Sequence, residues 1–73
     1  MENADIITSR DLGARIRSAR TELKLTQAEL ALASGVGIRF ISELENGKPT
    51  VRMDRVLRVL ASLGGHFRIE GNA

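Results

Sequence analysis

The stretch TQAELALASGVGIRFISELENG, residues 26–47, decides the fold of this chain. It opens with a capping box, in which the hydroxyl of Thr26 accepts a hydrogen bond from the amide of Glu29 and the Glu29 carboxylate accepts one from the amide of Thr26. We therefore expect a helix to begin at this point. Gly35 ends that helix, because glycine adopts the left-handed backbone conformation without steric strain at Cβ.

A second short helix is expected directly after this glycine. Its apolar residues recur at helical spacing from Ile38, and Asn46-Gly47 is a typical helix stop. Ala31 is small enough to let the second helix cross close over the first. The apolar residues expected to face the core are Val36, Ile41 and Leu44. Two short helices joined by a tight glycine turn form a helix-turn-helix.

A further helix is expected before this motif. Thr8 caps it, with Asp11 as the acid of a variant capping box. Ile7 and Leu12 occupy the two positions of a hydrophobic staple. The helix is predicted to run to about Leu23. Its apolar face recurs at helical spacing and consists of Leu12, Ile16, Ala19 and Leu23.

A last helix is expected after the motif. It begins near Val51 or Arg52 and ends at Leu63, before the helix-stopping pair Gly64-Gly65. Its core face is predicted to consist of Met53, Val56, Leu57, Leu60 and Leu63.

A short strand is predicted at the C-terminus, because residues 66–70 (HFRIE) alternate polar and apolar side chains. A lone strand leaves backbone groups unpaired, so antiparallel pairing with the same strand of a second copy is the economical arrangement. Pairing with Ile6-Ile7 is the alternative. The residues predicted to mediate dimerisation are Phe67, Arg68 and Ile69.

These elements predict an all-α fold, a small helical bundle with a helix-turn-helix, plus a short C-terminal strand that pairs across a dimer. We divide the chain into an N-terminal arm (1–7), a helix-turn-helix domain (8–64) and a dimerisation strand (65–71).

Composition limits the classes of function. The 73 residues suffice for one small domain, and the net charge of +2 permits a nucleic-acid partner. Without cysteine, and with a single histidine that has no neighbouring ligands, we expect no disulfide, metal site or cofactor. No enzyme is expected, since Glu43 and Glu45 face different sides of one helix and form no dyad. The absence of a long apolar run and of a signal-peptide pattern predicts a cytoplasmic protein without membrane contact.

Two strings within the motif, LTQAELA (25–31) and ISELENG (41–47), carry a family resemblance. They resemble the lambda-repressor-like, Xre-type helix-turn-helix family, over about Ser9 to Glu70. The string RFISELENGKPT (39–50) and the tail more narrowly resemble HipB-like antitoxins. That resemblance implies a C-terminal strand used in dimerisation. It also implies a HipA-like toxin kinase as partner, which the chain would neutralise, and autorepression of the shared operon.

In a helix-turn-helix, base readout requires side chains on the outward face at the start of the second helix. Arg39 suits this role because its guanidinium donates two hydrogen bonds to guanine N7 and O6, although a solvated surface charge is the alternative. Glu43, one turn later, either accepts from a cytosine amino group or holds Arg39 in place. The predicted base contacts are Ile38, Arg39, Ser42 and Glu43.

Phosphate contacts are predicted around this face and fix the register of the protein on DNA. Gln27 offers its amide from the first turn of its helix, aided by the helix N-terminus. Gly37 stands where the family often has a serine or threonine cap, so one hydroxyl is lost. Asn46 is either a phosphate contact or a structural cap. The predicted set is Gln27, Gly37, Asn46, Lys48, Thr50 and Arg52.

The resemblance also implies a structural ion pair. In the family, an arginine of the first helix commonly pairs with the glutamate of the LENG string, and both are present as Arg20 and Glu45. Removing one partner of such a buried pair costs about 3–5 kcal/mol. Phe40 is expected to pack in the core rather than wedge against DNA.

The leading interpretation is a homodimeric, sequence-specific transcriptional repressor, associated with the nucleoid and bound to a palindromic operator, with a HipB-like antitoxin as its narrower form. No small-molecule ligand is expected in so short a chain. The alternatives are a stand-alone phage-repressor-type regulator and a helix-turn-helix interaction module that does not contact DNA. Gly37, Ile38 and Glu43 favour the module, because they weaken the usual polar readout set.

Overall fold

The computed structural model describes residues 8–65, which form four helices. These are α1 (Ser9–Glu22), α2 (Gln27–Ser34), α3 (Ile38–Glu45) and α4 (Met53–Ser62). No strand occurs between residues 8 and 65, and the predicted all-α helix-turn-helix fold is confirmed. The expected arm with its staple residue Ile7, and the expected strand residues Phe67, Arg68 and Ile69, lie outside the described residues.

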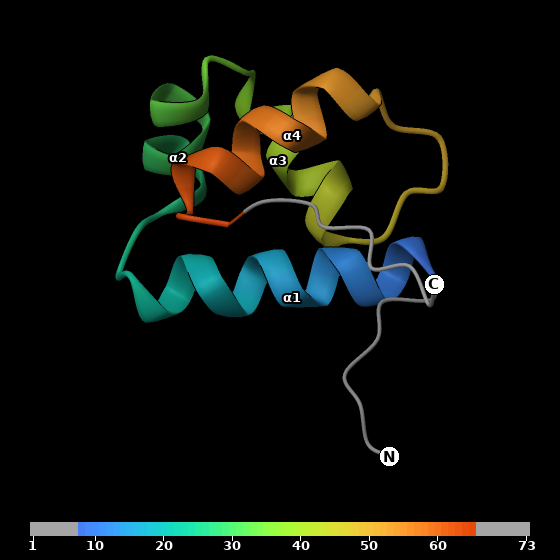
Figure 1. Cartoon of the computed structure of the whole chain (residues 1–73), viewed down its shortest axis with the longest axis horizontal. Helices are drawn as coiled ribbons and strands as arrows, with labels where there is room; N and C mark the ends of the chain where they lie inside the picture. Colours follow the sequence, from blue (N-terminus) through green and yellow to red (C-terminus); the bar gives the residue numbers. More distant parts are fainter. Residues whose placement is uncertain (1–7, 66–73) are drawn as a thin grey trace, which may run out of the picture.

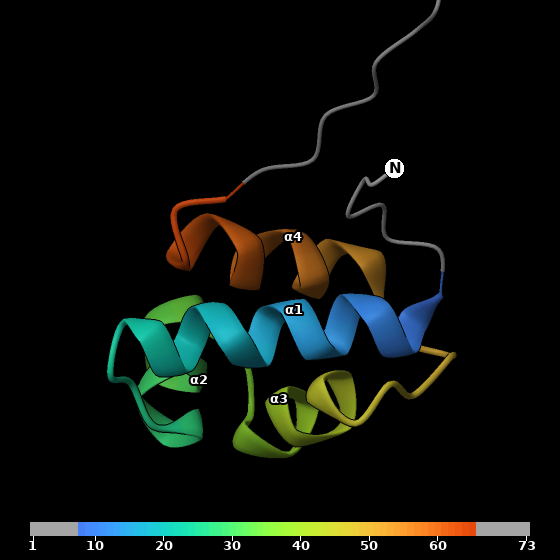
Figure 2. The same ribbon diagram turned by 90° about the horizontal axis from the view of Figure 1, so that it is seen from below.

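Helix α1 is the longest of the four and packs against α3. In Figure 1 α1 runs along one edge of the molecule, and the remaining helices lie on the same side of it. Figure 2 shows α4 above α1 and α3 below it. The motif helices α2 and α3 contact each other, α3 also contacts α1, and α4 contacts α2. The outer surface of α3 is therefore free of the other helices.

Local capping fixes where two of the helices begin. Thr8 and Asp11 form the expected capping box of α1, with the Asp11 amide donating to Thr8 Oγ1 over 3.1 Å. Thr26 and Glu29 do the same for α2, where the Thr26 amide donates to Glu29 Oε1 over 2.8 Å. Gly35 ends α2 in the left-handed conformation, at φ 70°. These three local predictions are confirmed. Each could be made from the sequence because it depends on residues close together in the chain.

One apolar core joins all four helices. The most deeply buried side chains are Ile16, Leu30, Ile41, Leu44, Val56 and Val59. Phe40 is also buried, as expected, and Ala31 is buried at the crossing of the two motif helices. The guanidinium of Arg55 lies 5.9 Å from the centroid of the Phe40 ring. The core therefore holds α3 by its inner face and leaves its outer face to solvent.

Gly13 allows α1 to approach the end of α3. A Cβ at this position would collide with the carbonyl oxygen of Leu44 and lie 2.9 Å from that of Glu45. The glycine is buried inside α1, where it costs conformational entropy. The close packing of the α1 backbone against the end of α3 explains why position 13 is a glycine.

Two predicted core faces were partly wrong. Leu57 and Met53 are 43% and 54% exposed, whereas Val59, which was not predicted, is fully buried. The apolar run of α4 contains more than one possible stripe, and packing against α2 selects the one through Val56 and Val59. Leu23 is 52% exposed because α1 ends at Glu22 and Leu23 is its C-cap.

None of the helices within residues 8–65 combines the length and the hydropathy that crossing a membrane requires.

Candidate nucleic-acid interface

The start of α3 presents polar side chains away from the core. Ile38 and Arg39 are exposed, and Ser42 and Glu43 are half-buried, so the predicted base-contact residues lie together on one face. The inner face carries the buried residues Phe40, Ile41, Leu44 and Glu45. Gly37 caps the helix without a side-chain hydrogen bond, which leaves backbone N–H groups of the first turn without a side-chain acceptor. This face has the placement that major-groove readout requires.

Glu43 lies between two cationic side chains. Its Oε2 is 3.5 Å from Nε of Arg39, and its Oε1 is 3.4 Å from Nζ of Lys48. The Arg39 side chain is 90% exposed and that of Glu43 is 34% exposed. Of the two predicted roles of Glu43, the one that orients Arg39 has a geometric basis here, and base reading stays a prediction. The contact with Lys48 was not predicted, because it joins α3 to the loop that follows.

Behind this face, a buried ion pair links α3 to α1. The guanidinium of Arg20 donates twice to the Glu45 carboxylate, over 2.7 Å from Nε to Oε2 and 3.0 Å from Nη2 to Oε1. Arg20 also donates to the carbonyl of Leu25 over 2.8 Å, which ties the α1–α2 connection to the same group. Only 11% of the Arg20 side chain and 3% of the Glu45 side chain are exposed. The expected Arg20–Glu45 pair is therefore present, and it fixes the end of α3.

Gln27 joins the same network. Its side-chain amide donates to Oε1 of Glu45 over 3.1 Å, so one amide proton is already used within the protein. A phosphate contact by Gln27 stays a prediction, and it has to use the remaining amide proton or the backbone N–H at the start of α2. Sequence reasoning missed this link because the two residues lie 18 positions apart.

Burial and hydrogen bonding act in opposite directions on Glu45. Burial alone would raise the pKa of the carboxyl, but hydrogen bonds from Arg20 and Gln27, with the charges of Arg20 and Arg17, lower it below its ordinary value. The hydrogen bonds that Arg20 donates to the Glu45 carboxylate raise the pKa of Arg20. Both groups are therefore charged at neutral pH, and the pair is a fixed structural contact.

The loop after α3 carries the remaining predicted phosphate contacts. Asn46, Lys48, Thr50 and Arg52 are all exposed. Asn46 is the C-cap of α3, and Gly47 turns the chain with φ 82°. Arg52 forms an ion pair with Asp54, 3.0 Å from Nη2 to Oδ2, with both side chains more than half exposed. The loop thus places cationic and amide groups beside the exposed face of α3, where phosphate contact stays a prediction for each.

Comparisons with known proteins also identify a helix-turn-helix in this chain. The HTH_3 family model, described as Helix-turn-helix, matches residues 16–69. The "Uncharacterized HTH-type transcriptional regulator y4mF" of Sinorhizobium fredii (strain NBRC 101917 / NGR234) is 52% identical over 59 residues, which are 81% of this chain and 78% of that protein.

Solved structures share the fold. Chains from the HipB-O4 20mer complex and the HipA-HipB-O2-O3 complex have TM-scores of 0.84 at 23% identity, covering 94% of this chain and 97% of those chains. The clp gene regulator ClgR from C. glutamicum has a TM-score of 0.73 at 35% identity, covering 85% of this chain and 80% of that chain. The chain therefore belongs to the Xre-type helix-turn-helix family and is a DNA-binding transcriptional regulator with the fold of HipB.

Proposed function

We propose that this chain is a sequence-specific transcriptional repressor that acts on the nucleoid in the cytoplasm and binds a palindromic operator as a homodimer. One observation carries the proposal: Arg39 is 90% exposed near the start of a helix whose opposite end is fixed by the buried Arg20–Glu45 pair. A rigid helix with a largely exposed guanidinium is suited to bidentate contact with guanine. Two such helices in a dimer enter successive major grooves, roughly 34 Å apart.

The proposed dimer forms through the C-terminal segment of the chain. In this proposal residues 1–7 form an arm, residues 8–64 the DNA-binding domain and residues 65–71 a strand that pairs with its copy. Phe67 and Ile69 supply its apolar side chains, and Arg68 lies between them. A closed two-fold dimer satisfies the unpaired backbone groups of such a strand.

The proposed biological role is that of a HipB-like antitoxin. It neutralises a HipA-like kinase toxin and, together with it, represses their shared operon. Support comes from the string RFISELENGKPT at residues 39–50 and from the fold shared with HipB, which has been solved in a HipA-HipB-O2-O3 complex.

A stand-alone regulator is the second candidate. The 35% identity to the clp gene regulator ClgR and the 52% identity to an HTH-type transcriptional regulator favour it, since neither name includes a toxin. The two candidates share the DNA interface and differ only in the protein partner.

Mobility shifts test the DNA half of the proposal. The probe is the duplex upstream of this protein's own gene, and the comparison is a random duplex of equal length, over a salt series. We expect saturable, specific binding that weakens steeply with salt. Arg39→Ala should lose roughly 1–3 kcal/mol of discrimination while the fold stays intact. The exposed Arg58 on α4 offers the matched control, Arg58→Ala.

Binding no tighter than to random DNA, by a folded dimer, would contradict the repressor proposal and favour an interaction module. Co-purification with a HipA-like protein encoded beside this gene tests the toxin half. Capture of that protein supports the antitoxin role, whereas operator binding without capture supports the stand-alone regulator.

A further inference from the structure

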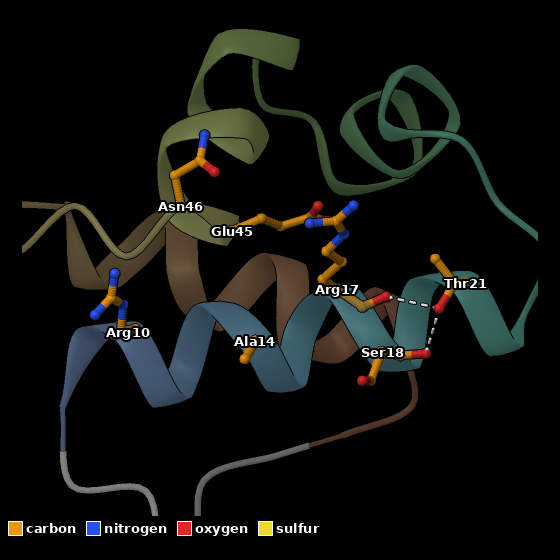
Figure 3. Close-up of a pocket in the computed structure, with 7 residues that line it drawn as sticks. All are labelled: Arg10, Ala14, Arg17, Ser18, Thr21, Glu45 and Asn46. Atoms are coloured by element: carbon orange, nitrogen blue, oxygen red, sulfur yellow. Dashed lines mark hydrogen bonds between the residues drawn. The ribbon is translucent and has the colours of Figure 1, made fainter.

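A pocket of about 460 Å³ lies between α1 and the C-terminal end of α3 (Figure 3). Its lining includes Arg10, Ala14 and Arg17 from α1, and Glu45 and Asn46 at the end of α3. Figure 3 shows Arg10 and Arg17 rising from α1 toward α3, with the short side chain of Ala14 between them. The space between the two guanidinium groups is therefore open.

The pocket has an excess of positive charge. Its one carboxylate, Glu45, already accepts hydrogen bonds from Arg20 and Gln27. Neither Arg10 nor Arg17 has a side-chain hydrogen bond or an ion pair within residues 8–65. Each guanidinium thus keeps a planar set of N–H donors that matches the oxygens of a phosphate.

The pocket adjoins the predicted DNA-facing loop. The hydroxyl of Ser9 donates to the carbonyl of Gly47 over 3.2 Å. A Cβ on Gly47 would lie 2.9 Å from the Cα of Arg10, so the start of α1 is packed directly against this loop. The pocket is also lined by Glu45. Gln27, at the start of α2, donates a hydrogen bond to the Glu45 carboxylate. The two arginines therefore lie between the start of α2 and the loop after α3.

We propose that this pocket binds the phosphate backbone of double-stranded DNA, with Arg10 and Arg17 contacting separate phosphates. The two residues are seven positions apart on one helical stripe, which corresponds to roughly 10 Å along the helix axis. A DNA strand carries a phosphate about every 3.4 Å of its axis, so one phosphate is available to each guanidinium. The inference rests on the proposed function and adds α1 to its DNA interface.

The test compares full-length variants that each remove one positive charge. Arg10→Gln and Arg17→Gln remove the proposed contacts, and Arg58→Gln is the matched control on the exposed surface of α4. Affinity for the duplex upstream of the gene and for a random duplex is measured from about 50 to 200 mM salt. Arg17→Lys keeps the charge and shows whether a charge alone maintains the salt dependence.

We expect Arg10→Gln and Arg17→Gln each to weaken binding to both duplexes by the same factor, because phosphate contacts do not read sequence. Each should reduce the slope of log affinity against log salt by about 0.9. A fourfold rise in salt would then weaken each variant about 3.5-fold less than the wild type. Arg58→Gln and Arg17→Lys should keep the wild-type slope.

Different failures are distinguishable. Unchanged slopes in both variants, with specific binding by the wild type, overturn the pocket inference and leave the repressor proposal intact. An effect on the specific duplex alone also overturns it, since that result indicates base readout. If the variants lose only capture of a HipA-like protein, the pocket binds an acidic protein surface instead. A wild type that binds no DNA overturns both proposals.

Discussion

At the residue scale, the charged groups of the motif divide into two kinds. The Arg20–Glu45 pair is buried, bidentate and supported by Gln27, so it fixes structure. The contacts of Glu43 with Arg39 and Lys48 are longer and partly exposed, so they are easily exchanged for other partners. The first kind positions α3, and the second can rearrange if the proposed DNA contacts form.

Glu43→Gln should relax sequence discrimination. The change removes a negative charge from the proposed DNA-facing surface and frees Arg39 and Lys48 from their shared partner. We expect tighter binding to random duplex and a smaller ratio of specific to random affinity. Competition mobility shifts measure that ratio. Glu22→Gln, an exposed change at the end of α1, is the control, and an unchanged ratio would show that Glu43 does not contribute to specificity.

The Glu45 pair should make stability depend on acid pH. Because the pKa of Glu45 is lowered in the folded chain from its ordinary value of 4.5, the unfolded chain takes up a proton first as the pH falls. The stabilisation is therefore complete above pH 4.5 and is lost as the pH falls from there through the lowered folded pKa. Urea unfolding of wild type and Glu45→Gln across this range measures the difference.

We expect the stability gap between wild type and Glu45→Gln to be largest near neutral pH and to narrow below pH 4.5. Breaking a buried pair costs about 3–5 kcal/mol, and the glutamine retains part of the hydrogen bonding, so the gap should lie at or below this range. Glu29→Gln keeps the capping geometry of α2 and is a suitable control. A stability difference between wild type and Glu45→Gln that stays constant with pH would contradict the lowered pKa of Glu45 in the folded chain.

At the scale of the elements, the close approach of α1 and α3 positions the exposed face of α3. Gly13 lets the backbone of α1 lie against the end of α3, and Gly47 lets the following loop lie against Arg10. Both contacts involve backbone atoms that have little freedom to move. The two glycines therefore set the position of α3 relative to α1 more strictly than side-chain packing alone.

Gly13→Ala should be destabilising although alanine favours helices. The added Cβ meets the carbonyl oxygens of Leu44 and Glu45, so α1 must shift away from α3. Overpacking of this kind costs about 1–3 kcal/mol. Thermal or urea unfolding measures it, with Gly65→Ala as the control because an added Cβ there makes only an ordinary contact, 3.4 Å from the carbonyl oxygen of Leu60. Stability equal to or above that of the wild type would show that α1 moves without cost.

At the scale of the whole molecule, the described domain is small, and the proposed repressor uses two copies of it to bind DNA. One recognition helix reads only half of a palindromic site, so affinity should depend on dimerisation. The proposed dimer strand lies beyond the described residues, which makes its removal a direct test.

A chain ending at Gly65 should be monomeric. Sedimentation is expected to give a dimer for the full chain and a monomer for the truncated one, with operator affinity reduced at equal protein concentration. Circular dichroism checks that the helices of residues 9–62 remain. A truncated chain that still sediments as a dimer would place the interface on the helical domain instead.

The sequence by itself determined the helices and the motif. Thr8 and Asp11, Thr26 and Glu29, and the turn at Gly35 act over a few residues of chain, so their spacing is enough to predict caps and ends. The helix-turn-helix and the outward placement of Arg39 followed from that local order. The Arg20–Glu45 pair, 25 positions apart, was predicted only through family resemblance.

Only the tertiary structure decided which distant groups meet. It selected Val59 over Leu57 for the core of α4, directed Gln27 to Glu45, and left Arg10 and Arg17 beside an open pocket. None of these follows from spacing, because each depends on the angle and distance at which two helices pack. Local hydrogen bonds act over three or four residues, whereas the burial of a stripe and the pairing of a charge depend on a partner element far along the chain.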